Sequence, residues 1–311
     1  MKYSMFHDEN LSTFSLGTVQ LGMAYGLGEF AQKPQKEDAF AILDCAKDGG
    51  VNNLDTANNY GDSEKVIGEW LNTLSAQERP FLVTKIGPFD HSCEEALRAD
   101  IFAQTEACLS TLGVSALDLL MVHSFADYEK NPDVVRDAFR QLKVCGKIRY
   151  SGLSVYSEDD YFEVARSGFD AVQIPLNVFD WRQIENGGVK AIADAGMAIF
   201  VRSVFLQGLV FISPDELDPR MEFCRPYLEK YYQLCTQWGM SPAVLALSYV
   251  LSVEGVISVV LGCQIADHVK ENCSLMDQVQ TLSKQQLDAL RQAFSNIDPR
   301  MIDPRQWFNS F

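Results

Sequence analysis

The chain alternates between two hydrophobic patterns. Amphipathic stretches, in which apolar residues recur at helical spacing with charges opposite, lie at residues 37–48, 63–74, 94–112 and 132–144. Apolar runs of strand length follow glycines that would end the preceding helix at positive φ, as in "AKDGGVNNLD", "KVCGKIRYSGLS" and "ADAGMAIFVRS". "ERPFLVTK" has proline at this junction, and "TFSLGTVQ" supplies an opening strand. The pattern predicts eight strands with helices between them.

This alternation predicts one α/β domain over residues 1–311. Crossovers of helical length force neighbouring strands to be parallel, and eight such units predict a closed (β/α)8 TIM barrel. The chain is longer than eight strand–helix units require, and the additional residues predict an insert between strands seven and eight (203–256) and a C-terminal tail. The alternative is an open doubly wound sheet, whose glycine fingerprint "GLGEFA" (26–31) matches formally. It is followed by "QKPQ" instead of a helix, which favours the barrel.

Composition and charge restrict the functions that this barrel can have. The net charge is −16, which argues against nucleic acid or an anionic membrane as a surface-wide partner. The N-terminus "MKYSMFHDEN" lacks the apolar core of a signal peptide, and no uninterrupted apolar stretch approaches the roughly 18 residues of a membrane span. The eight cysteines form no C-x-x-C motif and no zinc-like pairing with the four histidines. We therefore expect reduced thiols, no metal site and a cytoplasmic location.

Four reactive side chains lie at or just after strand ends, which a barrel gathers on one rim. Lys85 and His123 close apolar strands, Asp55 closes another, and Tyr60 follows it in "LDTANNYG". A buried ammonium is costly unless paired, and Asp55 can supply the opposite charge. A phenol beside that ammonium has its pKa lowered from its ordinary value near 10, which makes it a better proton donor. Each residue alone also fits a structural role, but their convergence indicates a catalytic site.

These four groups predict a reaction at a carbonyl. They suit protonation of a carbonyl oxygen, or deprotonation of an alcohol in the reverse direction, without a metal. No side chain can donate a hydride, so the reaction implies a nicotinamide cofactor.

The same segments resemble the aldo-keto reductase superfamily over residues 13–275. "LDTANNYGDSE" is similar to its D-T-A-x-x-Y-G-x-S-E signature, and "VTK" and "LLMVHS" are similar to its lysine and histidine strand ends. The resemblance implies that Tyr60 is the general acid/base, that Lys85 lowers its pKa, that Asp55 pairs with Lys85, and that His123 orients the carbonyl. It also implies a small-molecule carbonyl substrate.

The resemblance further implies a set of cofactor-binding residues in the second half of the chain. They are Ser154, Gln173, Arg202, Ser203, Leu206, Gly208, Gly262, Cys263, Gln264, His268, Glu271 and Asn272.

Several cofactor positions depart from the family pattern. Arg202 replaces a frequent aromatic residue, although a planar guanidinium also stacks on a nicotinamide. Gly262 and His268 stand where a lysine and an arginine often hold a 2′-phosphate. The resemblance implies NADPH as the cofactor, because the family commonly uses it, with NADH as the alternative.

The substrate candidates implied by the resemblance are aromatic residues in loops or in the tail: Tyr25, Phe125, Trp181 and Trp307. "LGTVQLGMAYGLG" is similar to a bacterial branch linked to carbohydrate metabolism, so we expect a sugar-like carbonyl substrate. Three alternatives remain open: an NAD-dependent aldose 1-dehydrogenase, a cofactor-binding regulatory subunit with little turnover, and a Schiff-base aldolase acting through Lys85. No heptad or apolar stripe indicates an oligomeric state.

Overall fold

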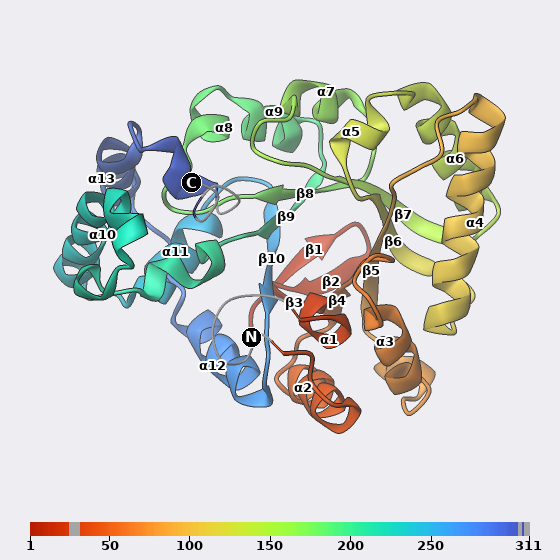
Figure 1. The fold of residues 1–311 in the computed structure, drawn as a ribbon, viewed down its shortest axis with the longest axis horizontal. Helices are drawn as coiled ribbons and strands as arrows, with labels where there is room; N and C mark the ends of the chain where they lie inside the picture. Colours follow the sequence, from red (N-terminus) through yellow and green to blue (C-terminus); the bar gives the residue numbers. More distant parts are fainter. Residues whose placement is uncertain (25–31, 304–306, 308–311) are drawn as a thin grey trace.

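In a computed structural model, which describes residues 1–24, 32–303 and 307, eight parallel strands close into a barrel (Figure 1). Their order around the barrel is β10-β3-β4-β5-β6-β7-β8-β9. The predicted (β/α)8 fold is confirmed. The strands are β3 (Phe14–Gly17), β4 (Asn53–Asp55), β5 (Phe81–Ile86), β6 (Leu117–Val122), β7 (Ile148–Ser154), β8 (Ala171–Pro175), β9 (Ala198–Arg202) and β10 (Val256–Gly262).

One main helix follows each strand and covers the outside of the barrel. The glycines at the predicted helix-to-strand junctions have φ between 67° and 84°, as the sequence pattern required: Gly50, Gly113, Gly146, Gly168, Gly196 and Gly255. The covering helices are α2 (Lys36–Asp48), α3 (Ser63–Leu71), α4 (Glu94–Leu112), α6 (Pro132–Val144), α7 (Tyr161–Arg166), α9 (Gly188–Asp194), α11 (Pro242–Val250) and α12 (Ala266–Gln278).

A β-hairpin that the sequence analysis did not predict closes the N-terminal end of the barrel. It consists of β1 (Tyr3–Phe6) and β2 (Glu9–Ser12). Its buried Phe6 and Leu11 belong to the apolar cluster inside the barrel, together with Phe81, Met121 and Phe200. The hairpin fills this end, and the cavity lies at the opposite, C-terminal ends of the strands.

The predicted insert between β9 and β10 is confirmed, and it forms a separate layer with the C-terminal helix. In Figure 1 α10, α11 and α13 lie together beside the barrel. The rings of Phe179 and Tyr231 lie 5.2 Å apart, and those of Phe179 and Phe294 lie 5.0 Å apart. The layer contains η2 (Leu206–Phe211), η3 (Pro214–Glu216), η4 (Pro219–Cys224), α10 (Arg225–Trp238), α13 (Lys284–Phe294) and η5 (Pro299–Ile302).

Short elements complete the loops: α1 (Val19–Gly22), η1 (Ala76–Glu78), α5 (Phe125–Tyr128) and α8 (Arg182–Glu185). The eight cysteines are free thiols, as expected. Over residues 1–24, 32–303 and 307, none of the helices has both the length and the apolar character needed to cross a bilayer.

Candidate active site

A buried ion pair lies at the carboxyl ends of two neighbouring strands. Lys85 on β5 is fully buried, and its Nζ donates hydrogen bonds to Asp55 Oδ1 at 2.7 Å and to the Thr56 carbonyl at 3.0 Å. The second carboxylate oxygen of Asp55 accepts a hydrogen bond from Gln173 Nε2 at 2.7 Å. An unpaired charge at this depth would be strongly destabilising, so each member of the pair needs the other.

The loop after β4 holds Tyr60 against this ion pair. A Cβ added to Gly22 would lie 1.7 Å from the Tyr60 carbonyl oxygen, so only glycine lets α1 approach the loop so closely. The Ser63 hydroxyl donates to Thr18, which fixes the end of the loop. As a result the Lys85 Nζ lies 5.3 Å from the centroid of the Tyr60 ring.

His123 completes the group from the end of β6. Its ring meets the Tyr60 ring nearly edge-on, with the centroids 5.7 Å apart and the planes at 77°. Burial, followed by the positive charges of Lys85 and Arg202, lowers the pKa of His123 to about 3. The imidazole is therefore neutral at physiological pH, and its Nδ1 is buried without a hydrogen-bond partner. The structure thus gathers the four side chains that the sequence analysis singled out as catalytic.

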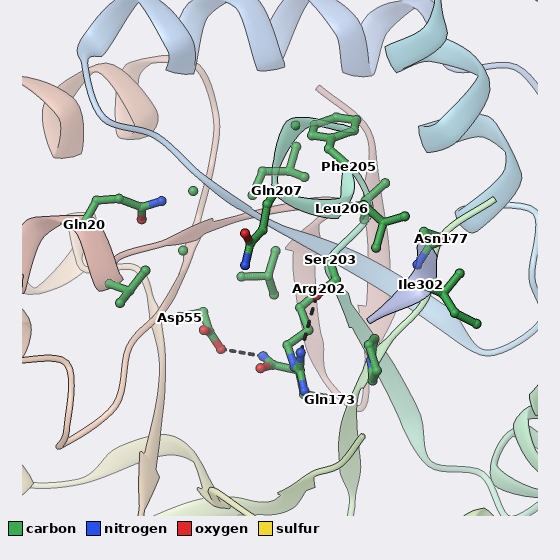
Figure 2. A pocket seen from close by; sticks show the side chains of 18 of the residues that line it. Gln20, Asp55, Gln173, Asn177, Arg202, Ser203, Phe205, Leu206, Gln207 and Ile302 are labelled. Carbon is green, nitrogen blue, oxygen red and sulfur yellow. Dashed lines mark hydrogen bonds between the residues drawn. The ribbon is translucent and has the colours of Figure 1, made fainter. Parts of the chain in front are cut away.

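A cavity of about 790 Å3 opens beside these residues, and both Asp55 and Tyr60 line it. Cavities of this size accommodate cofactors. All the predicted cofactor residues line it except Ser154 and Cys263, which are buried. Figure 2 shows the hydrogen bond between Gln173 and Asp55 in its wall, which connects a predicted cofactor residue to the ion pair.

The wall after β9 has an unusual backbone. Ser203, Leu206 and Gln207 are non-glycine residues with φ of 62°, 45° and 52°, and Gly208 follows at 96°. Such left-handed conformations are strained for residues with a Cβ, and strain of this kind concentrates at binding sites. All four residues line the cavity.

Arg202, at the end of β9, presents its guanidinium to the same wall. The Arg202 Cζ lies 4.5 Å from the centroid of the Tyr156 ring, and Nη2 donates to the Val155 carbonyl at 3.1 Å. Nη1 donates to the Ser203 hydroxyl at 3.4 Å. Tyr156 was not predicted as a site residue. The sequence feature that could have identified Tyr156 is its position directly after the "GLSV" segment.

The far end of the cavity is formed by the end of β10 and the first turns of α12. The cavity is lined here by five of the cofactor residues that the resemblance implied: Gly262, Gln264, His268, Glu271 and Asn272. The Asn272 amide donates a hydrogen bond to the buried Cys263 sulfur at 3.3 Å.

Gln20 of α1 joins this end of the cavity, and the sequence analysis missed it. It belongs to an apolar segment, "TVQLG", whose pattern gives no sign of a binding residue. Only the fold brings α1 beside β10.

The aromatic residues predicted to bind substrate occupy other places. Phe125 and Trp181 are buried, and the Trp181 Nε1 donates to the Val178 carbonyl at 2.9 Å. Trp307 is also buried in the main apolar cluster, and it donates to the Arg300 carbonyl at 2.8 Å within the same C-terminal segment. None of these three lines the cavity, since their large apolar rings are used in packing. Tyr25 lies outside the described residues.

Comparison with known proteins shows which family the chain resembles. The model of the aldo/keto reductase family matches residues 14–294. "Aldo-keto reductase str7" of Strobilurus tenacellus is 30% identical over 66% of this chain, and the match spans 61% of that protein. "Uncharacterized oxidoreductase YqkF" of Bacillus subtilis is 27% identical over 89% of this chain and 94% of its own. "NADH-specific methylglyoxal reductase" of Escherichia coli is 25% identical over 78% of this chain and 85% of its own.

Solved structures share the fold. The holo form of the aldo-keto reductase AKR11C1 from Bacillus halodurans has a TM-score of 0.77 and 21% identity, covering 97% of this chain and 100% of its own. The glycerol dehydrogenase AKR11B4 from Gluconobacter oxydans has a TM-score of 0.74 and 23% identity, covering 96% of this chain and 98% of its own. The family prediction made from the strand-end motifs is confirmed: the chain belongs to the aldo/keto reductase family of NAD(P)H-dependent oxidoreductases.

Proposed function

We propose that this protein reduces an aldehyde or ketone to an alcohol, with Tyr60 as the general acid. The observation that carries the proposal is the Asp55–Lys85 ion pair, buried beside Tyr60 and His123 at the wall of a cofactor-sized cavity. When bound, a reduced nicotinamide supplies the hydride. The residues present fit such a cofactor, because the cavity offers amide groups and a strained loop where the family pattern expects nucleotide contacts.

Each of the four residues has a separate part in the proton transfer. Tyr60 gives its hydroxyl proton to the carbonyl oxygen, and the Lys85 ammonium stabilises the phenolate that remains. Asp55 balances the charge of Lys85 and fixes its position. The neutral imidazole of His123 carries one N–H, which donates to the same carbonyl oxygen and orients it.

The hydrogen bonds of Lys85 argue against the Schiff-base alternative. An attacking amine needs a free lone pair. The Lys85 Nζ instead donates to a carboxylate at 2.7 Å and to a carbonyl at 3.0 Å.

The cavity wall is compatible with a sugar-like carbonyl substrate and with an aromatic aldehyde. Tyr156 and Phe211 both line the cavity and are exposed large aromatic residues. Their ring faces suit the apolar face of a sugar as well as an aromatic aldehyde. We keep a sugar-like carbonyl as the proposed substrate, and an assay panel must contain both kinds of compound.

The test is oxidation of NADH and NADPH, followed by absorbance, with a panel of aldehydes, ketones and free sugars. Tyr60→Phe removes one hydroxyl and is expected to lower kcat by about 10²- to 10⁴-fold. It should leave cofactor binding unchanged. Tyr3→Phe is the matched control, because the exposed Tyr3 lies in the hairpin at the opposite end of the barrel.

Three results would contradict the proposal. Wild-type kcat in Tyr60→Phe would remove Tyr60 from its role. Nucleotide binding without turnover of any compound would favour the regulatory subunit. Oxidation of free sugars with NAD+, without reduction of other carbonyls, would favour the aldose dehydrogenase.

A further inference from the structure

The Lys85 ammonium is held by two acceptors, and the second of them is a backbone carbonyl. Its Nζ donates to Asp55 Oδ1 at 2.7 Å and to the Thr56 carbonyl at 3.0 Å. An ammonium has three N–H donors, so these two bonds fix two of the three. The position of the Thr56 carbonyl therefore helps to decide where the positive charge lies beside the Tyr60 ring, whose centroid is 5.3 Å from Nζ.

The side chain of Thr56 is bonded to the first residue of α3. Its Oγ1 donates a hydrogen bond to the Ser63 hydroxyl at 3.0 Å, and its backbone N–H donates to the Val83 carbonyl at 2.8 Å. Thr56 is 1% exposed and Ser63 is 0% exposed. Because both hydroxyls are buried, removing one of them leaves the other unsatisfied and removes a constraint on the position of Thr56.

The same hydroxyl of Ser63 reaches Thr18. It donates to Thr18, whose carbonyl and hydroxyl oxygens both lie 2.9 Å away. The Thr18 hydroxyl in turn donates to the Asp55 carbonyl at 2.8 Å. We call Thr18, Thr56 and Ser63 the hydroxyl network. It contacts both of the residues that accept hydrogen bonds from Lys85.

Ser63 also fixes the turn that carries Tyr60. Its backbone N–H donates to the Tyr60 carbonyl at 3.1 Å. Its side chain lies against α1, because a Cβ added to Gly22 would lie 2.8 Å from the Ser63 Cβ. One buried serine thus contacts the loop that carries the phenol and, through Thr56, the acceptor of the ammonium.

Neither Ser63 nor Thr56 is placed to touch a ligand. Both are almost completely buried, and neither of them lines the cavity. Thr18 differs from them, since it does line the cavity. Any effect of Ser63 or Thr56 on catalysis must therefore be transmitted through Lys85 and Tyr60.

We propose that Ser63 is a positioning residue that acts through Thr56 on the Lys85 ammonium. By holding Thr56, it keeps the ammonium in place beside the Tyr60 hydroxyl. This inference rests on the proposed function, in which Tyr60 is the general acid and Lys85 stabilises its phenolate. Without the bond between Ser63 and Thr56, the ammonium keeps Asp55 but loses a fixed second acceptor, so it stabilises the phenolate less. Tyr60 is then a weaker acid.

The experiment measures kcat, KM and the pH dependence of kcat for the reduction of para-nitrobenzaldehyde, an electron-poor aldehyde, with NADPH and with NADH. Thr56→Val removes the hydroxyl and keeps the shape of the side chain. We expect kcat to fall about 10-fold, because the lost interaction acts in the transition state. KM, and the Kd of the cofactor measured by calorimetry, should stay within about twofold of the wild type, because Thr56 contacts no ligand.

The pH dependence distinguishes positioning from a general weakening of the fold. Reduction needs a protonated Tyr60, so kcat falls at high pH as the phenol ionises. Weaker stabilisation of the phenolate raises the pH of this ionisation, so in Thr56→Val the fall in kcat should move upward by about one pH unit. The neighbouring His123 stays neutral in this range, since its pKa is about 3, and Arg202 keeps its charge.

Two further variants test the hydrogen bond between the two side chains. Thr56→Ser retains the hydroxyl and should restore both the kcat and the pH dependence of the wild type. Ser63→Ala removes the acceptor and should have the same kinetic effect as Thr56→Val.

Thr105→Val is the matched control for the loss of a buried hydroxyl. Thr105 is 0% exposed, and its Oγ1 donates to the Ile101 carbonyl at 2.8 Å within α4. Its substitution should lower the midpoint of thermal unfolding by about 2–4 °C, as Thr56→Val does. It should leave kcat and its pH dependence at their wild-type values.

The inference is overturned if Thr56→Val keeps the kcat and the pH dependence of the wild type, or if its kcat falls without a shift in pH dependence. It is equally overturned if Thr105→Val reproduces the kinetic changes, or if Thr56→Ser does not reverse them. If neither Thr56→Val nor Ser63→Ala folds, the hydroxyl network serves the fold and the inference also fails.

Each of these results leaves carbonyl reduction by Tyr60 intact, because the wild type and Tyr60→Phe report on it separately. A wild-type protein that reduces no compound of the panel contradicts the proposed function itself, and this inference with it.

Discussion

The Asp55–Lys85 ion pair and the β10–α12 end of the cavity differ in how completely their polar groups are satisfied by the protein. At the catalytic end, Lys85 donates to Asp55 and to Thr56, and Gln173 holds the other oxygen of Asp55. At the β10–α12 end, the Gln20 Oε1 has no partner, and Asn272 is held by a sulfur atom. The Asp55–Lys85 ion pair is thus held by the protein itself, whereas the Gln20 amide oxygen at the other end is not. Substitutions at the two ends should therefore have different effects.

The largest effect should come from breaking the ion pair. Lys85→Met leaves Asp55 buried and charged, which we expect to lower the free energy of unfolding by about 3–5 kcal/mol. Activity should also fall, because the phenolate of Tyr60 loses its stabilising charge. Urea unfolding and kcat measure the two losses.

A double variant separates stability from catalysis. Lys85→Met combined with Asp55→Asn replaces both charges, so it should recover most of the lost stability and none of the activity. If Lys85→Met is as stable as the wild type, the ion pair with Asp55 does not contribute to the free energy of unfolding as expected here.

A smaller effect is expected from His123, and it depends on pH. Its pKa of about 3 in the folded protein lies below its ordinary value of 6.5. Between these values the unfolded chain binds a proton that the folded chain does not, so stability falls as the pH decreases from about 6.5 toward 3. At pH 5 the loss should be about 2 kcal/mol.

His123→Asn tests this, because it removes the titrating group. Its unfolding free energy should decrease less than that of the wild type between pH 7.5 and pH 5, by that amount. Equal decreases in the two proteins would show that His123 titrates normally.

The smallest effect is expected at the β10–α12 end of the cavity. Asn272→Ala removes a hydrogen bond to a thiol, which is a weak acceptor, so stability should change by less than about 0.5 kcal/mol. NADH affinity should fall about 5- to 10-fold, since an amide contact contributes about 1 kcal/mol. Calorimetry and urea unfolding measure both quantities. A loss of stability with unchanged affinity would assign Asn272 to the fold instead of the ligand.

Local sequence signals were sufficient to predict most of the strands and helices of the fold. The ends of α4 and α6 match the predicted segments 94–112 and 132–144, because Gly113 and Pro132 mark a helix end and a helix start. The N-terminal hairpin was missed since its buried positions are mainly Phe6 and Leu11, too few to form a pattern. Its turn also uses His7 at φ 52° in place of glycine.

The residues of the candidate site also include some that local sequence signals could predict and some that they could not. The convergence of Asp55, Tyr60, Lys85 and His123 could be predicted because a barrel brings strand ends together whatever their separation in sequence. Gln20 was not predicted, because its position depends on contact with Gly262 at the other end of the chain. Trp181 and Trp307 are buried and do not line the cavity, and sequence alone does not distinguish an aromatic residue in a cavity wall from one in packing.

The pairing of the first and last barrel strands has a consequence for biosynthesis. Val259 pairs with Phe14, and the Ser258 hydroxyl donates to the Ser12 carbonyl, so the earliest and latest strands share one seam. During translation the opening strand must wait, without its neighbour, until almost the whole polypeptide has left the ribosome. Contacts this distant in sequence form slowly. The nascent chain therefore exposes an unpaired, aggregation-prone edge for most of its synthesis, and this is the period in which a chaperone would be needed.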